Sequence, residues 1–140
     1  MFQAVYATQA VYHMGHLSDA EILATGRLRA RQFDLTGFLL RTDQTFLGVV
    51  EGDERAVNDM LDRIARDPRR RMVMRCGPYH NLRRMFPDWS MGYGPMRRDG
   101  FDDDITALKP TELDRHVIVQ NLIRIAHDQW GTDNYPLVQT

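Results

Sequence analysis

Two histidines and a run of three arginines are the side chains whose types and spacing could do chemistry. His13 and His16 have i, i+3 spacing in YHMGH, but a metal site needs three or four ligands and nothing nearby completes one. We therefore expect solvated loop histidines. The run Arg69-Arg70-Arg71 could bind a phosphate, because arginine donates paired hydrogen bonds to phosphate oxygens. The alternative, which the sequence favours, is that these cations complement the C-terminal end of a helix dipole.

Other signals of enzymatic chemistry are weak. Cys76 is the only cysteine and lies in the apolar alternation Met72, Met74, Cys76, so we expect a buried structural thiol. GYGP at 92–95 lacks the lysine and the following helix of a phosphate loop. A small acylphosphatase-like hydrolase stays open as an alternative, although no loop carries the arginine and strand asparagine that it requires. We expect the domain not to be an enzyme.

Composition bounds the class of protein. The chain has 140 residues, 43% of them hydrophobic, which is enough for one domain with a real core. A net charge of −1 argues against a protein held to nucleic acid or to a membrane surface by bulk charge. The N-terminus lacks the basic start of a signal peptide, and no segment approaches the ~18 apolar residues of a membrane span. We expect a cytoplasmic protein with no nucleic-acid or membrane partner.

Strands and helices alternate along the first 94 residues, which we expect to form one domain. Periodicity predicts strands at 2–8, 35–41, 45–50, 71–76 and 88–93, and helices at 18–29 and between Asp53 and Pro68. Ser18 with Glu21 is predicted to form a capping box, and Asp53 to cap the second helix. The order β-α-β-β-α-β-β with right-handed crossovers puts both helices on one face. The sequence therefore predicts an α+β, ferredoxin-like sandwich with a five-stranded mixed sheet.

A polar and acidic stretch at 95–110 is predicted to be a linker, followed by an amphipathic helix at 111–130 and a tail at 131–140. Thr111 with Asp114 can cap this helix. Its predicted apolar stripe consists of Leu113, Val117, Ile118, Leu122, Ile125 and Ala126. Such a stripe must be covered, either by the open face of the sheet or by a partner protein.

Four segments, taken in order, resemble the BLUF family, the blue-light sensors that use flavin. They are VYAT at 5–8, DLTGFLL at 34–40, FLGVVEG at 46–52, and RDPRR at 66–70 followed by FPDWSMGY at 86–93. The resemblance implies that FAD or FMN would bind between the two helices, against the sheet. It also implies a photochemical tyrosine and glutamine beside the flavin ring.

The resemblance carries over residue by residue, but unevenly. Positions that match the family's flavin slot are Tyr6, Ile22, Ile64, Asp67, Arg69, Trp89 and Met91. Tyr6 matches the photoactive tyrosine, while Thr8 stands where the family often has serine and Arg70 where it usually has histidine. Aromatic and methionine side chains also pack well in cores. For Tyr6, Trp89 and Met91 the sequence favours core roles over photochemical ones.

Two departures from the family pattern fall in the photochemical site. Ala30 stands at the position of the asparagine that would clamp the flavin ring, and Gly48 at that of the glutamine. Glutamine offers a carbonyl and two N–H donors, whereas glycine offers no side chain at all. Each hydrogen bond lost to a buried polar ligand costs about 1–3 kcal/mol when the ligand atom stays unsatisfied. The resemblance therefore implies a degenerate site that binds flavin weakly or not at all.

The function that follows is a bacterial-type sensory or regulatory domain without BLUF photochemistry. It would act through a protein partner or by self-association, using the sheet face and the C-terminal helix. The alternative is a working FAD-binding blue-light photoreceptor with an unusual site.

Overall fold

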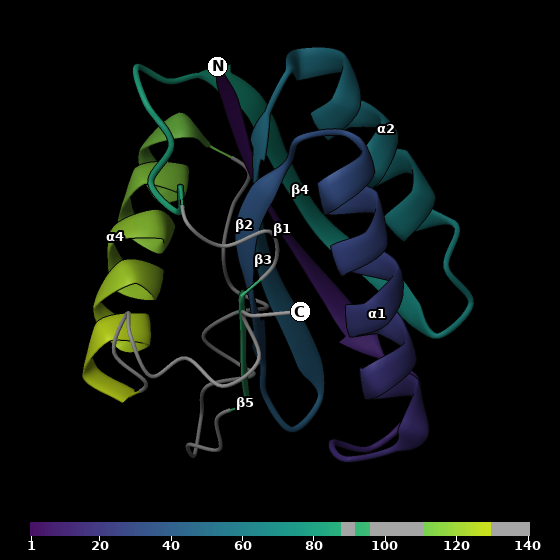
Figure 1. Ribbon diagram of the computed structural model, residues 1–140. Helices are drawn as coiled ribbons and strands as arrows, with labels where there is room; N and C mark the ends of the chain where they lie inside the picture. Colours follow the sequence, from purple (N-terminus) through teal and green to yellow (C-terminus); the bar gives the residue numbers. More distant parts are fainter. Residues whose placement is uncertain (88–91, 96–110, 130–140) are drawn as a thin grey trace.

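The computed structural model describes residues 1–87, 92–95 and 111–129 as a sheet with helices on both faces (Figure 1). Helices α1 and α2 cover one face, and α4 covers the other. The elements in chain order are β1 (Phe2–Ala10), α1 (Leu17–Gln32), β2 (Thr36–Arg41), β3 (Thr45–Gly52), α2 (Glu54–Ala65), β4 (Arg70–His80), β5 (Gly92–Pro95) and α4 (Glu112–Gln129).

The strand order β4-β1-β3-β2-β5 confirms the predicted ferredoxin-like α+β sandwich. All neighbours are antiparallel except β2 and β5, which run parallel, so the sheet is mixed. β1 and β3 lie in the centre, as right-handed β-α-β crossovers require. The predicted strand at 88–93 overlaps β5 at its last two residues, while 88–91 lie outside the described residues.

The side of the sheet that faces α1 and α2 carries the core on which the candidate site is built. Its buried apolar residues are Ala4, Tyr6, Ile22, Leu23, Ala30, Leu35, Leu39, Phe46, Val50, Val57, Met60, Leu61, Ile64 and Tyr93. α2 buries an apolar stripe with i, i+3, i+4, i+7 spacing, made of Val57, Met60, Leu61 and Ile64. The apolar face of α1 is narrower, since Ile22 and Leu23 are buried but Leu28 is exposed.

α4 covers the opposite side of the sheet, which settles the choice that the sequence left open. Ile118, Val119 and Leu122 are buried against Val5, Phe38 and other residues of the sheet. Val117, predicted in the stripe, is 53% exposed, and Val119 takes a place in the core that the predicted stripe did not include. The side chains of Leu113 and Ala126 lie outside the described residues. The sheet face is therefore occupied within this chain and is not a free docking surface.

Of the three predicted helix caps, only the one at the start of α1 differs from expectation. α1 begins at Leu17, and His16 is its N-cap, with Nδ1 accepting a 3.0 Å hydrogen bond from the Ser18 backbone N–H. The predicted Ser18 capping box is wrong, because the Ser18 hydroxyl lies 3.0 Å from the same ring nitrogen. Asp53 caps α2 as predicted, and Thr111 Oγ1 accepts from the Asp114 backbone N–H.

β4 is longer and less regular than predicted. Its register against β1 shifts between Ala7 and Thr8, so that Met72 packs toward the helices while Met74 and Cys76 pack toward α4. The predicted alternation therefore does not lie on a single face. The strand continues through Gly77 and Pro78, although such a pair is typical of a turn, because a second register shift absorbs them.

Candidate functional site

A cleft of about 200 Å³ lies between α1 and α2, at the end where α2 leads into β4. Its lining is Ile22, Thr25, Gly26, Arg29, Met60, Arg63, Ile64, Asp67, Pro68, Arg69 and Arg70. Four of the positions that resemble the family's flavin slot, Ile22, Ile64, Asp67 and Arg69, thus meet in one place. Their roles toward a flavin stay predictions. Trp89 and Met91 lie outside the described residues.

The rim of the cleft is held by an ion pair within the loop that follows α2. Arg69 Nε and Nη2 each donate to a different Asp67 carboxylate oxygen at 2.9 Å, and the Arg69 backbone N–H donates to Oδ1 at 3.0 Å. Burial alone would raise the pKa of Asp67, but the hydrogen bonds and charge of Arg69 and the charge of Arg70 outweigh it. The pKa of Asp67 is therefore lowered from its ordinary value.

This lowered pKa predicts an acid-sensitive contribution of Asp67 to stability. Because the pKa of Asp67 is lower in the folded state, the ionised carboxylate stabilises the protein at pH values above its ordinary pKa of 3.8. That contribution is lost as the pH falls through the folded-state pKa. We expect urea unfolding to show a smaller drop in stability below about pH 4 for Asp67→Asn than for wild type. Arg69→Gln should reduce the drop in the same way. An unchanged acid slope in both variants would contradict the assignment.

Arg70 is a buried part of the cleft lining, with 8% of its surface exposed. Its guanidinium lies over the rings of Phe46 and Tyr6, at 5.3 and 5.8 Å from their centroids. Asp67 is the nearby counter-charge, at 3.7 Å from Nε, which is beyond hydrogen-bond distance. Nε and Nη1 of Arg70 are buried without a hydrogen-bond partner.

Tyr6 occupies the space beside Gly48. The two residues are direct partners in the β1–β3 ladder, and Tyr6 is 1% exposed. A Cβ atom at position 48 would lie 2.3 Å from Tyr6 Cζ and 2.5 Å from its hydroxyl oxygen. Gly48 does not have a positive φ, so it is required for space and not for backbone conformation. The Tyr6 ring thus fills the space in which a side chain at position 48 would begin.

Ala30, the second departure, is completely buried in the last turn of α1. Its carbonyl accepts the backbone N–H of Leu35 at 2.8 Å, which ties the end of α1 to the approach to β2. Its methyl group is part of the core that faces the helices. This position therefore presents an apolar surface where the resemblance implies a polar clamp.

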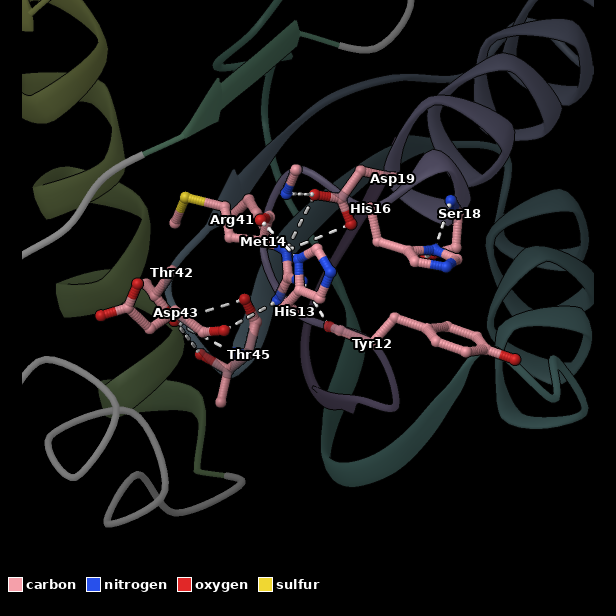
Figure 2. Close-up of polar contacts among 11 residues, drawn as sticks. Tyr12, His13, Met14, His16, Ser18, Asp19, Arg41, Thr42, Asp43 and Thr45 are labelled. Carbon is pink, nitrogen blue, oxygen red and sulfur yellow. Dashed lines mark hydrogen bonds and ion pairs between the residues drawn. The ribbon is translucent and has the colours of Figure 1, made fainter.

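A buried arginine at the end of β2 was missed by sequence reasoning. Figure 2 shows Arg41 reaching toward Asp19 at the start of α1, and its Nε lies 3.3 Å from both carboxylate oxygens. Nη2 donates to the Tyr12 carbonyl at 2.8 Å, and the guanidinium lies 4.6 Å from the Phe46 ring centroid. Arg41 is completely buried, and these contacts fix the loop before α1 to the sheet.

Burial raises the pKa of nearby Tyr93 to about 12, with the charge of Asp19 adding to the rise and the charge of Arg41 opposing it.

A buried polar network on the α4 side was also missed. The Glu51 carboxylate accepts from Gln3 Nε2 at 2.9 Å and from the backbone N–H groups of Met85 and Phe86 at 2.7 Å each. Gln3 in turn accepts a hydrogen bond from Arg115 of α4. Glu51 is part of the FLGVVEG segment, but a strand glutamate carries no signal of burial in the sequence. The network connects α4, the sheet centre and the segment after β4.

The remaining candidate residues, the histidines, Cys76 and Arg71, make contacts within the protein. His16 caps α1 and stacks on Tyr12 with centroids 4.2 Å apart, and no group of three possible metal ligands occurs among the described residues. Cys76 is buried, its Sγ lies 3.1 Å from the Thr111 carbonyl oxygen, and burial raises its thiol pKa. The predicted burial of the Cys76 thiol is thus confirmed. Arg71 does not line the cleft and donates to Gln9 Oε1 at 2.6 Å.

The fold and the cleft together define a small α+β domain with a ligand-sized opening between two helices on one side of the sheet. The family model described as "Sensors of blue-light using FAD" matches residues 1–92. The chain therefore belongs to the BLUF family, and its class of function is sensory signalling. This confirms the resemblance drawn from the four sequence segments.

Among curated proteins, the chain is similar to photoactivated adenylate cyclase subunit beta of Euglena longa. The two are 33% identical over 89 residues, which is 62% of this chain and 9% of that protein. The chain thus spans less than a tenth of that relative. Enzyme-linked BLUF proteins carry catalysis in other domains, so the BLUF domain is not itself catalytic.

Solved structures show the same fold. The dark state of the BLUF protein BlrB gives a TM-score of 0.68 at 20% identity, covering 88% of this chain and 95% of that one. The photo-activated state of BlsA gives 0.70 at 19% identity, covering 87% and 94%. Klebsiella pneumoniae BlrP1, in a manganese and cyclic-diGMP complex, gives 0.64 at 20% identity, covering 91% and 34%. Among the described residues, no helix has the length and apolar character needed to cross a membrane.

Proposed function

We propose that this domain is a BLUF-family signalling module that does not perform the tyrosine–glutamine photoswitch and acts through contact with a protein partner. The observation that carries the proposal is the position of the Tyr6 ring, which fills the space where a side chain at position 48 would begin. A side chain that is absent cannot rotate or rearrange its hydrogen bonds to a flavin carbonyl. The chain has an alanine at position 30 and a glycine at position 48, where the resemblance implies amides.

The partner surface in this proposal is the outward side of the domain and not the sheet face. Since α4 covers the sheet, a partner that binds the resting domain would contact α4 from outside or displace it. Exposed Val117 supplies one apolar side chain on the outward side of α4. The same proposal includes a cytoplasmic location. The partner is either a different protein or a second copy of this chain.

Absorbance spectroscopy tests the proposal. We expect the purified protein, mixed with FAD, to show no reversible red shift of the flavin bands on blue illumination, because the hydrogen-bond switch lacks its glutamine. Without flavin binding, the domain would act only through its contacts. With flavin bound and no shift, it would respond to flavin or to its redox state. A reversible red shift would overturn the proposal.

The cleft between α1 and α2 is the observation that favours the alternative, a working flavin photoreceptor. It is open, and Ile22, Ile64, Asp67 and Arg69 all line it. The same light-induced red shift that would overturn the first proposal would establish this one.

A further inference from the structure

A buried cation and a buried anion lie on the side of the sheet that α4 covers. Arg115 of α4 is 1% exposed, and Glu51 of β3 is completely buried. Among the described residues, the carboxylate within ion-pair distance of Arg115 is that of Glu112, which lies 3.8 Å away on the same helix and has a 60% exposed side chain. An exposed partner offsets little of the cost of burying a charge. The burial of Arg115 therefore depends on polar groups that the sheet supplies.

Gln3 of β1 bridges the two buried charges. Its Nε2 donates to Glu51 Oε2 at 2.9 Å, and its Oε1 accepts a hydrogen bond from Arg115 Nη1. Because a carboxylate only accepts hydrogen bonds and a guanidinium only donates them, the reversed amide would lose both bonds. Gln3 is 1% exposed, so water has little access to either end of the amide. The amide therefore has one orientation, which the two charges set together.

The other contacts of Arg115 do not replace this bond. Arg115 Cζ lies 5.3 Å from the Tyr79 ring centroid, but a ring face attracts the charge without accepting hydrogen bonds from the guanidinium edge. Nη2 lies 3.1 Å from His116 Nε2, and Nε is buried without a hydrogen-bond partner. Without the guanidinium, Gln3 Oε1 would be a buried acceptor that has lost its donor, which favours a different position of the amide.

At the other end of the bridge, the Glu51 carboxylate holds the segment that leaves β4. It accepts hydrogen bonds from the backbone N–H groups of Met85 and Phe86 at 2.7 Å each. Successive hydrogen bonds in a chain polarise one another, so a change at Arg115 weakens the bonds at Glu51. Phe86 also packs in the same apolar cluster as Ile118 of α4. The segment is thus connected to α4 by a polar route through Gln3 and by an apolar route.

We propose that the Gln3 amide couples the docking of α4 to the hold of Glu51 on residues 85–86, so that release of either one loosens the other. The coupling is reciprocal, because an interaction free energy between two sites acts equally in both directions. A protein that displaces α4 would therefore change the segment that leads from β4 towards β5. This inference goes beyond the proposed function, because the coupling belongs to the folded domain and needs neither flavin nor a partner.

Native-state hydrogen exchange of variants tests the proposal. Arg115→Met keeps an apolar side chain and removes the donor, so it should lower the protection of the Met85 and Phe86 amides at least about fivefold. In a Gln3→Met background the bridge is already absent, so Arg115→Met should change the same protection by less than about twofold. Equal effects in the two backgrounds would overturn the proposal, because the apolar route alone would then carry the coupling. Unchanged protection in the Arg115→Met single variant would also overturn it.

Arg124→Met is the matched control. Arg124 of α4 is exposed, and its Nη2 donates to Asn121 Oδ1 of the same helix at 2.6 Å. We expect this change to leave the protection of the Met85 and Phe86 amides as it is in wild type. A loss as large as that caused by Arg115→Met would show that any change in α4 acts on residues 85–86, which contradicts the role of Gln3.

Exchange in the unaltered protein supplies a second readout that does not depend on the folding of a variant. The amides of Met85 and Phe86 should open together with those of Ile118 and Val119, at a lower free energy than the amides of β1 and β3. Opening of α4 while residues 85–86 stay protected would overturn the proposal, and so would opening of both only together with β1 and β3. None of these measurements uses light or flavin, so a failure here is distinct from a failure of the proposed function.

Discussion

Glu51→Ala is expected to lower the free energy of unfolding by about 3–5 kcal/mol, because three donors lose a buried acceptor and each loss costs about 1–3 kcal/mol. The donors are Gln3 Nε2 and the backbone N–H groups of Met85 and Phe86. Glu51 is completely buried, so water cannot replace the carboxylate without a rearrangement of the core. For a domain of this size the melting temperature should fall by about 10 °C or more.

Hydrogen exchange of the Glu51→Ala variant shows which part of the structure is loosened. The amides of Met85 and Phe86 should lose protection more than the amides of β3 itself, since their acceptor is removed while the strand ladder is kept. Glu54→Ala, at an exposed position in the first turn of α2, is the matched control and should cost less than about 1 kcal/mol. A similar loss of stability in the two variants would show that the buried carboxylate is not the cause.

Gly48→Ala is expected to destabilise the protein by about 1–3 kcal/mol, the usual cost of overpacking a core. The new methyl carbon would start 2.3 Å from Tyr6 Cζ, and Tyr6 is too buried to move away without displacing its neighbours. Chemical denaturation of the single variant measures this cost.

A double-mutant cycle assigns the cost to the tyrosine ring. In a Tyr6→Leu background the space above position 48 is open, so Gly48→Ala should cost much less and the two changes should couple by about 1 kcal/mol or more. Tyr6→Phe keeps the ring and should leave the cost as it is in wild type. Equal costs of Gly48→Ala in the Tyr6→Leu and wild-type backgrounds would refute the packing account.

This packing links the two photochemical positions of the family in one steric relation. A glutamine at position 48 fits only if the Tyr6 ring leaves its present place, since the first side-chain carbon already collides with it. The glycine at position 48 and the inward position of the Tyr6 ring are thus two aspects of one arrangement. For the same reason, replacing Gly48 alone does not simply return the site to the family pattern.

The sequence by itself determined the class of fold and the family. Apolar periodicity and the order of elements predicted the sandwich, since alternation in strands and the 3.6-residue repeat in helices are local properties of the chain. Four ordered segments indicated the family, and several residues matched to the slot between the helices, such as Ile22 and Asp67, do meet in one cleft. The cap at Asp53 was equally local, because its acceptor lies two or three residues from its donors.

Only the tertiary structure decided how the interior is filled, because contacts between residues far apart in sequence carry no local signal. It placed the Tyr6 ring beside Gly48, packed α4 on the sheet face and buried Glu51 among donors more than thirty residues away. It also corrected the cap of α1 from Ser18 to His16, a choice made by side-chain geometry. The arginine run shows the division most clearly: three adjacent cations in the sequence become an ion pair at Arg69, a buried donor at Arg70 and a strand contact at Arg71. Backbone direction and burial set these three environments, and residue type alone does not encode them.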